Sequence, residues 1–394
     1  MKSGPLSGLR VLEMAGTAPA PFACMLLADL GADVLRLDRA DRVSPEARAP
    51  VDPLARNRRS VGVDLKAAGG VALVKRLAVE ADILVEGFRP GVMERSGLGP
   101  ELLLAINPRL IYARMTGFGQ DGPLAARAGH DINYIAVAGA LEPVGRRGER
   151  PHAPLNMVGD FGGGGMLLAF GILAALHERS SSGTGQVVDA AMVDGAALLT
   201  AFVHGLRAEG QWSDERGTNL LDGGAPFYDT YETADDKYVA VGALEGRFYA
   251  QLLQGLGIDR ESLPHRMSRR SWPELRERFA ASFKERTREE WSEVFADLDA
   301  CVTPVLAPHE VAASSHSMAR NGFVEVDGVE QPAPAPRFSR TPAAVPSAPR
   351  APGADTHEAL VDWGVTPDEV TALLASSAIA CVDTFAGLNQ ERTA

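Results

Sequence analysis

The sequence predicts an α/β fold, with a Rossmann-like parallel sheet in a large domain and a smaller α+β domain after it. In the N-terminal third of the chain, short apolar runs alternate with segments of helical spacing. This alternation is typical of parallel sheets with right-handed crossovers. A breaker cluster at residues 16–21 follows the first apolar run, where a first strand-to-helix turn is expected. The length of 394 residues allows two domains.

The elements of the large domain follow from this pattern. Short apolar runs predict strands at residues 9–14, 33–37, 60–65, 82–86 and 110–115. Helical spacing covers residues 22–30 and 69–80. Residues 166–205 predict two apolar, Ala-rich helical segments, separated by a break rich in Ser and Gly at 180–185.

The sequence changes in character near Gly223, where the smaller domain is expected. Residues 228–232 and 237–241 predict paired strands with a turn at 234–236. Residues 331–353 are rich in Pro and Ala, which predicts an extended connector. Amphipathic spacing predicts helices at 248–256, 272–295 and 366–375.

Composition and charge limit the class of protein. Hydrophobic residues make up 45% of the chain and charged residues 23%, as in ordinary soluble proteins. The three cysteines form no C-x-x-C pair, so neither a metal site nor a disulfide framework is expected. A net charge of −12 argues against nucleic-acid binding. Residues 1–130 carry a net charge of +3, however, which suggests a local anionic ligand.

Targeting signals are not apparent in the sequence. The first residues lack the apolar centre of a signal peptide. The longest uncharged run, residues 161–176, is shorter than the roughly 20 residues that a membrane span needs. We therefore expect a buried helix there, no membrane span, and a cytoplasmic protein.

A nucleotide site is one possibility for the first strand-to-helix turn. The dinucleotide fingerprint G-x-G-x-x-G is missing, because residues 16–21 supply one glycine. Arg36 and Arg39 lie at the end of the second predicted strand, where they are placed to meet a phosphate. Further candidates are Arg56, Arg58, Arg59, Lys66, Arg89 and Arg95. Taken alone, each basic residue of this region is more often a solvated surface charge than a phosphate ligand.

His130 and Asp160 are the candidate acid/base groups, and each has two interpretations. His130 lies in a polar segment between apolar ones, where it either caps a helix or acts as a general base. Asp160 precedes four glycines and an apolar helix. It is either an N-cap beside a flexible entry loop or an acid that a ligand approaches closely.

Nine stretches of the chain identify its relatives. The chain resembles the α-methylacyl-CoA racemase branch of the class III CoA-transferase (CaiB/BaiF) family from residue 5 to about 345, and GHDINY is the block that points to the racemases. The matching stretches are LSGLRV at 6–11, LADLGA at 27–32, EGFRPGV at 86–92, YARMTGFGQ at 112–120, GHDINY at 129–134, GDF at 159–161, GQVVDA at 185–190, DGGAP at 222–226 and DACVTPV at 299–305.

The resemblance implies an activity and a site. It implies a racemase (epimerase) that interconverts (2R)- and (2S)-2-methylacyl-CoA thioesters by 1,1-proton transfer through an enolate. His130 and Asp160 are the implied catalytic pair, and Glu245 is implied to orient His130 across a dimer interface. CoA is part of the substrate, so no separate cofactor is expected. The implied CoA contacts are Arg39, Val63, Asp64, Leu65, Lys66, Arg89, Arg95, Gly129, Asp131, Ile132, Asn133 and Tyr134.

The resemblance also implies the organisation of the chain as an interlocked homodimer. The expected parts are a CoA-binding domain at 1–205, a linker at 206–225, a small domain at 226–325 and a C-terminal segment at 326–394 that returns to the large domain. The racemase pattern usually has Glu-Pro-Gln-Phe where this chain has Glu245-Gly246-Arg247-Phe248. This departure leaves the local shape and the acyl preference open, as well as the pathway that the enzyme serves.

Two alternatives belong to other classes of function. A CoA transferase of the same fold would use Asp160 as a nucleophile and would not need His130. It would also carry a glycine-rich loop near residues 242–245, which are not glycine-rich here. A catalytically inactive nucleotide-binding module is the other alternative, but both acid/base candidates are present.

Overall fold

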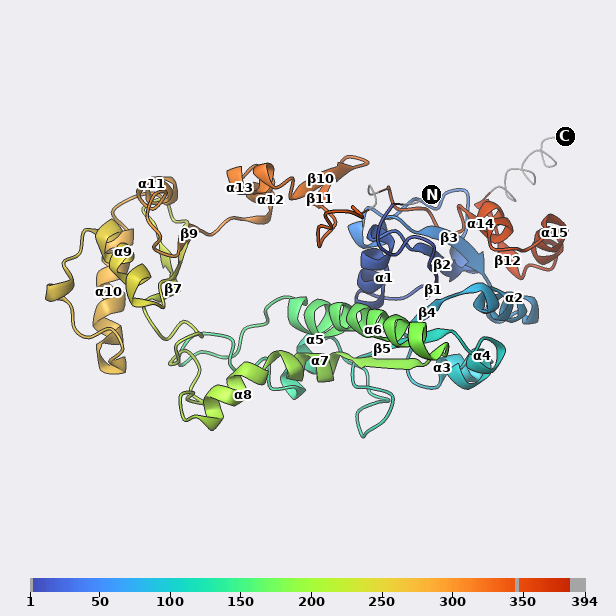
Figure 1. The fold of residues 1–394 in the computed structure, drawn as a ribbon, viewed down its shortest axis with the longest axis horizontal. Helices are drawn as coiled ribbons and strands as arrows, with labels where there is room; N and C mark the ends of the chain where they lie inside the picture. The colour runs from blue at the N-terminus through green and yellow to red at the C-terminus, as the bar shows by residue number, and fades with distance from the viewer. Residues whose placement is uncertain (1–2, 344–346, 383–394) are drawn as a thin grey trace. The chain divides into compact units, whose positions relative to one another are not determined.

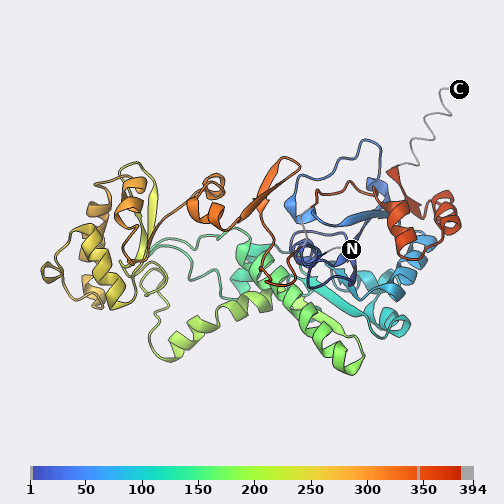
Figure 2. The ribbon, with the colours of Figure 1, turned by 45° about the horizontal axis from the view of Figure 1, so that its top comes forward.

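The computed structural model describes residues 3–343 and 347–382. Within these residues the chain folds into two compact units. The first comprises the described parts of Met1–Ala138, Leu155–Leu199 and Met318–Ala394, and the second comprises Gly139–Pro154 and Thr200–Ser317. Figures 1 and 2 show the chain coloured by residue number.

A seven-stranded sheet forms the centre of the first unit. From β3 to β6 its strands run parallel in the order β3-β2-β1-β4-β5-β6, and β12 pairs antiparallel with β3 at one edge. This is the strand order of the Rossmann fold. The strands are β1 (Arg10–Met14), β2 (Asp33–Arg39), β3 (Arg59–Val63), β4 (Ile83–Glu86), β5 (Ile111–Thr116), β6 (Val187–Ala191) and β12 (Ile379–Ala380).

Helices cover both faces of this sheet, as Figure 1 shows. Alternate strand residues enter two different cores: Leu12 and Met14 belong to one, Val11 to the other. The first core packs against α2 (Ala68–Glu80), α4 (Pro100–Ile106), α14 (Thr356–Asp362) and α15 (Pro367–Ala375). The second core packs against α1 (Pro19–Asp29) and α6 (Leu167–Ser182). The predicted α/β class is confirmed.

The remaining helices and strands of the first unit are short. They are α3 (Val92–Arg95), α5 (Asp131–Val137), a π-helix (Met157–Met166), α7 (Met192–Leu199), β10 (Phe323–Val326) and β11 (Val329–Pro332). A further short helix, α13 (Ser315–Ala319), spans the boundary of the two units.

The second unit is a small α+β structure. Its sheet has three antiparallel strands in the order β7-β8-β9. Rings of Tyr231, Phe279, Phe283 and Trp291 contact one another in the core. The elements are β7 (Tyr228–Glu232), β8 (Tyr238–Gly242), β9 (Val302–Pro304), α8 (Ala201–Ala208), α9 (Gly246–Leu256), α10 (Trp272–Phe283), α11 (Arg288–Val294) and α12 (Pro308–Val311).

Three predicted elements differ in the structure. Residues 166–205 contain a strand, β6, which the Ala-rich sequence hid because β6 runs directly into α7. The expected helix at 272–295 is two helices, because Thr287 begins a new helix with a capping box to Glu290. Helix α1 begins at Pro19 within the breaker cluster, since proline is tolerated in the first turn of a helix.

The apolar run at 161–176 lies in a longer helical stretch than predicted. Met157–Ser182 is long and apolar enough to cross a membrane by length and composition alone. In the structure it packs on β5, β6 and α1 with Leu168 and Ile172, which are fully buried. The expectation of a buried helix is only half right, because Phe170 on the same helix is 69% exposed.

The observed units differ in their bounds from the expected domains. The chain leaves the first unit at Leu199 and returns to it at Met318, and Gly139–Pro154 belongs to the second unit. Ion pairs account for this placement: Arg147 pairs with Glu215 at 2.8 Å, and Arg216 pairs with Glu142 at 2.6 Å. These pairs join residues far apart in the sequence, so a segment-by-segment prediction does not find them.

Candidate active site

A cavity of about 430 Å³ lies at the carboxyl ends of the parallel strands. In Rossmann-like sheets ligands bind where neighbouring strands send their crossovers to opposite faces. Here β1 leads to α1 on one face, and β4 leads to α4 on the other. Thr17 follows β1, Arg89 follows β4, and both line the cavity. The cavity therefore occupies the position that this fold uses for ligands.

His130 lines this cavity as the N-cap of α5. Its backbone N–H donates to Oδ1 of Asn133 at 3.0 Å, which fixes the first turn of the helix. The ring of Tyr134 packs edge-to-face on Phe118 at 4.9 Å. A Cβ on Gly129 would come within 2.8 Å of that ring, so glycine is needed there. His130 occupies the N-cap position and its side chain is exposed, while its role as a general base stays a prediction.

Asp160 lines the same cavity from a different element, the π-helix that continues into α6. The expected flexible glycine loop is wrong, because the four glycines lie inside this helix. They allow close packing: a Cβ on Gly163 would lie 2.5 Å from the backbone nitrogen of Ala196 on α7. Asp160 is therefore held by a helix that is itself tightly packed on α7.

The surroundings of Asp160 raise the pKa of its carboxyl group above the ordinary value. Burial is the largest cause, and the nearby charge of Asp131 adds to it. The Nδ2 group of Asn156 donates to Oδ2 of Asp160 at 3.0 Å, and this bond and His130 lower the pKa. The balance favours a proton on Asp160 more than for a free aspartate.

The phosphate-binding candidates divide between two neighbouring cavities of the first unit. Arg89 lines the cavity of His130 and Asp160. Arg39 lines a second cavity of about 500 Å³, and Thr17 belongs to the walls of both. Arg42 and Arg48 also line the second cavity, although the sequence did not single them out. Their place in the loop after β2 was the available signal.

Other basic candidates serve the fold. Arg58 pairs with Glu13, and both side chains are buried. Arg56 pairs with buried Asp29 at 2.6 Å. Arg59 pairs with Asp33 and Asp362, both at 2.6 Å. These three arginines are structural counter-charges rather than free phosphate ligands.

The remaining expected CoA contacts stand outside the walls of both cavities. Val63 ends β3, and Asp64 accepts a hydrogen bond of 2.9 Å from the backbone N–H of Lys66 just after it. Arg95 ends α3. Those that line neither cavity are Val63, Asp64, Leu65, Lys66, Arg95, Asp131, Ile132 and Asn133.

Glu245 belongs to the second unit. It is exposed and precedes the first residue of α9 as its N-cap. Gly246 and Arg247 replace the residues of the usual racemase pattern. The guanidinium of Arg247 lies over the ring of Phe248, 4.4 Å from its centre. Helix α9 therefore forms without the usual proline.

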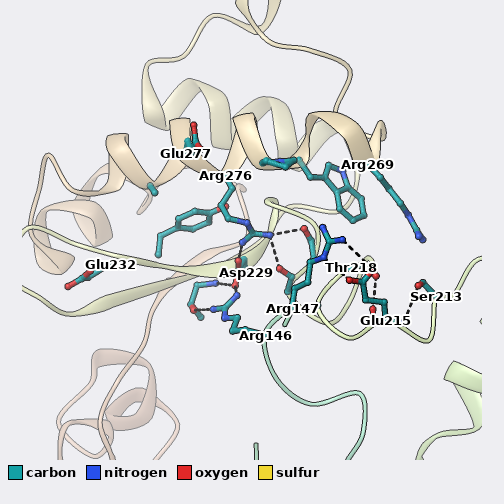
Figure 3. A pocket seen from close by; sticks show the side chains of 18 residues that line it. Arg146, Arg147, Ser213, Glu215, Thr218, Asp229, Glu232, Arg269, Arg276 and Glu277 are labelled. Atoms are coloured by element: carbon teal, nitrogen blue, oxygen red, sulfur yellow. Dashed lines mark hydrogen bonds and ion pairs between the residues drawn. The ribbon is translucent and has the colours of Figure 1, made fainter. Parts of the chain in front are cut away.

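The second unit has a cavity of its own, of about 760 Å³ (Figure 3). Arg276 and Arg146 both pair with Asp229, and Arg276 also donates to the carbonyl of Gly224 at 2.7 Å. Arg147 pairs with Glu215 at 2.8 Å. Two arginines thus share the Asp229 carboxylate, and neither histidine nor cysteine is among the described residues that line this larger cavity. Among the described residues, no cluster of three or more His, Cys, Asp or Glu is placed to hold a metal ion.

Comparison with known proteins places the chain in a family. A sequence model of CoA-transferase family III matches residues 6–357. The chain belongs to CoA-transferase family III. Two family relatives are named alpha-methylacyl-CoA racemase. The one from Mus musculus is 49% identical over 372 residues, and the one from Homo sapiens is 47% identical over 371; each match covers 93% of this chain and 96% of the relative.

A solved structure agrees with the family assignment. The crystal structure of a CAIB/BAIF family protein from Brucella suis has a TM-score of 0.77 to this chain. It is 26% identical and covers 92% of this chain and 99% of its own. The family resemblance predicted from the nine sequence stretches is confirmed.

Proposed function

We propose that this protein is a racemase of 2-methyl-branched acyl-CoA thioesters. The observation that carries the proposal is that His130 and Asp160 line one cavity from two separate elements. An α-carbon racemises when a proton leaves one face and another arrives on the opposite face. Two proton-transfer groups in one cavity provide both steps without turning the substrate.

The protonation of Asp160 fits this reaction. In one direction, neutral His130 removes the α-proton and protonated Asp160 delivers a proton to the other face. In the reverse direction, ionised Asp160 is the base and protonated His130 is the acid. The raised pKa of Asp160 brings its two protonation states closer together in population near neutral pH.

The enolate between the two steps needs a hydrogen-bond donor at its oxygen. The backbone N–H of Asp131 is in the first turn of α5, where N–H groups have no partner inside the helix. The glycines at 162–165 are less suitable, since they lie within the π-helix and its packing. Asp131 directly follows His130 of the cavity wall, and we propose that its N–H binds the thioester oxygen.

The CoA moiety supplies the anionic part of the substrate, so no separate cofactor is required. Arg89 and Arg39 line neighbouring cavities that share Thr17. Guanidinium groups bind phosphate with paired hydrogen bonds. We propose that Arg39 and the nearby Arg42 and Arg48 bind the nucleotide end of CoA, while Arg89 lies closer to the thioester.

We further propose that the enzyme works in the cytoplasm as an interlocked homodimer, with Glu245 of one subunit orienting His130 of the other. Apolar side chains on the surface of the first unit support a partner. Phe170 of α6 is 69% exposed, and Leu198 and Leu199 of α7 are 64% and 57% exposed. Contiguous apolar patches mark association surfaces in soluble proteins, and we propose that these three side chains contribute to one.

The CoA-transferase alternative rests on the same aspartate. Asp160 is half-buried in the cavity and is placed as well for nucleophilic attack as for proton transfer. His130 distinguishes the two functions, because a transferase has no need of it.

The test uses one pure epimer of a 2-methylacyl-CoA in deuterated water without an acceptor acid. We expect deuterium to enter the α-position while chirality is lost. A parallel reaction contains a free carboxylic acid as acceptor. CoA transfer to that acid faster than α-exchange would contradict the racemase and favour the transferase.

A further inference from the structure

The side chain of Asp131 has an unusual environment beside the candidate acid/base pair. It is 5% exposed at the first position of α5. Its Oδ2 accepts a hydrogen bond of 2.7 Å from the backbone N–H of Asp160. Its Oδ1 is buried and has no hydrogen-bond partner among the described residues. A buried carboxylate oxygen without a donor is costly and rare, so it needs an explanation.

A glycine at position 159 allows the carboxyl group of Asp131 to lie close to the π-helix. A Cβ on Gly159 would lie 2.4 Å from Oδ2 of Asp131, closer than real atoms approach. Glycine at this position therefore lets the start of α5 and the π-helix meet. The approach places the carboxyl groups of Asp131 and Asp160 in one cluster, where the charge of the first acts on the second.

We propose that Asp131 is a positioning residue for the reaction proposed above: its carboxylate fixes the Asp160 backbone and sets an unmatched negative charge beside the Asp160 carboxyl group. The hydrogen bond to the main chain fixes where Asp160 stands relative to His130. The unpaired oxygen leaves the negative charge uncompensated, and a nearby negative charge makes a second carboxylate harder to ionise. The role in catalysis rests on the proposed function, whereas the electrostatic relationship does not.

Other charged groups around Asp160 are few. His130 at the start of α5 acts in the opposite direction to Asp131 and lowers the pKa of Asp160. Arg89 and Asp160 both act on the pKa of Tyr134, which burial raises. Asp194 is exposed on α7, which packs on the π-helix, and its charge acts on Asp189. Asp194 is thus a matched control for removing one negative charge near the same helix.

The experiment measures the titration of Asp160 directly. The full-length protein is labelled with carboxyl-¹³C aspartate, and the Asp160 signal is assigned by its loss in Asp160→Asn. In Asp131→Asn the remaining amide oxygen still accepts the bond from the Asp160 N–H, but the charge is gone. We expect Asp160 to titrate at lower pH in Asp131→Asn than in the wild type, and at an unchanged pH in Asp194→Asn. An unchanged titration in a folded Asp131→Asn variant overturns the inference.

A second variant keeps the proposal testable if Asp131→Asn does not fold. Asp131→Glu keeps the charge, so we expect Asp160 to titrate near the wild-type pH. A shift to lower pH in Asp131→Glu, in a protein with wild-type far-ultraviolet circular dichroism, would show that charge is not the cause.

The same variants are then assayed for exchange at the α-carbon. For the epimer that needs protonated Asp160, we expect kcat of Asp131→Asn near neutral pH to fall roughly tenfold, with KM little changed. Equal losses at every pH would indicate a merely structural role. Absence of exchange in the wild type would contradict the proposed function, while the carboxyl titration would still decide the relationship between Asp131 and Asp160.

Discussion

Nδ2 of Asn156 donates a hydrogen bond of 3.0 Å to Oδ2 of Asp160, four residues further along the chain. Asn156 is the N-cap of the π-helix, so the helix that carries the acid also carries the group that tunes it. This bond stabilises the ionised carboxyl group and lowers its pKa, against the larger effect of burial. Burial and this bond therefore act in opposite directions on the protonation of Asp160.

Replacing Asn156 tests this balance. Asn156→Ala removes the donor, so the pKa of Asp160 is expected to rise further. For the epimer whose proton Asp160 removes, the ionised form is required, and the rising limb of the pH–rate profile should move to higher pH. The profile of kcat from pH 5 to 9 measures the shift. A limb that moves to lower pH would contradict the assigned effect of the bond.

Replacing Arg58 is predicted to lower stability, whereas replacing Arg39 is predicted to weaken CoA binding. Arg58 is buried against Glu13, so Arg58→Met leaves an unpaired buried carboxylate and should cost about 3–5 kcal/mol of unfolding free energy. Arg39 is exposed at the cavity with Asp41 as its partner, so Arg39→Met should leave stability unchanged and weaken CoA binding. Urea unfolding and calorimetric titration with CoA measure the two effects. The same loss of stability in both variants would refute the distinction.

The packing of the glycine-rich helix gives a third prediction. Gly195→Ala places a Cβ 1.8 Å from the Gly163 carbonyl oxygen, so it should destabilise the fold by roughly 1–3 kcal/mol through overpacking. Gly205 of α8 is the control, because a Cβ there meets nothing within 4 Å. Gly205→Ala should be neutral or stabilise by about 0.5–1 kcal/mol. Thermal unfolding of both variants is the measurement, and a harmless Gly195→Ala would show that α7 does not pack as described.

An active site shared between subunits predicts complementation. Asp160→Ala and Glu245→Ala should each be inactive alone as homodimers. A mixed dimer contains one site with both groups intact, provided that Glu245 serves the partner subunit. Co-expression with two different affinity tags isolates the mixed dimer. Activity there supports the shared site, whereas an inactive mixed dimer, or an active monomer in sedimentation, contradicts it.

The sequence predicted the parallel sheet well because its strands are short apolar runs that repeat between helices. β1 through β5 therefore appear close to their expected positions. β6 was missed because it is followed at once by a helix in Ala-rich sequence, and its pairing with β5 is long-range. The local sequence pattern does not reveal which strand pairs with β6.

The sequence named the two acid/base candidates but not the geometry around them. His130 and Asp160 were found through the sequence blocks around them, and the structure places both on one cavity. The contact of Asn156 with Asp160 and the burial of Asp131 depend on how α5 meets the π-helix. One of the two sequence interpretations of Asp160 placed a flexible loop beside it, whereas the glycines at 162–165 lie inside the π-helix, where tertiary packing needs their small size.

Exchange of the α-proton in single variants tests the central claim most directly, namely that His130 and Asp160 serve opposite faces of the α-carbon. Each pure 2-methylacyl-CoA epimer is incubated in deuterated water with His130→Ala or Asp160→Ala, and deuterium incorporation and chirality are followed. Both variants should lose racemisation by about a hundred- to ten-thousand-fold. His130→Ala should still exchange the proton of one epimer only, and Asp160→Ala that of the other. A His130→Ala variant that racemises at the wild-type rate would contradict the account.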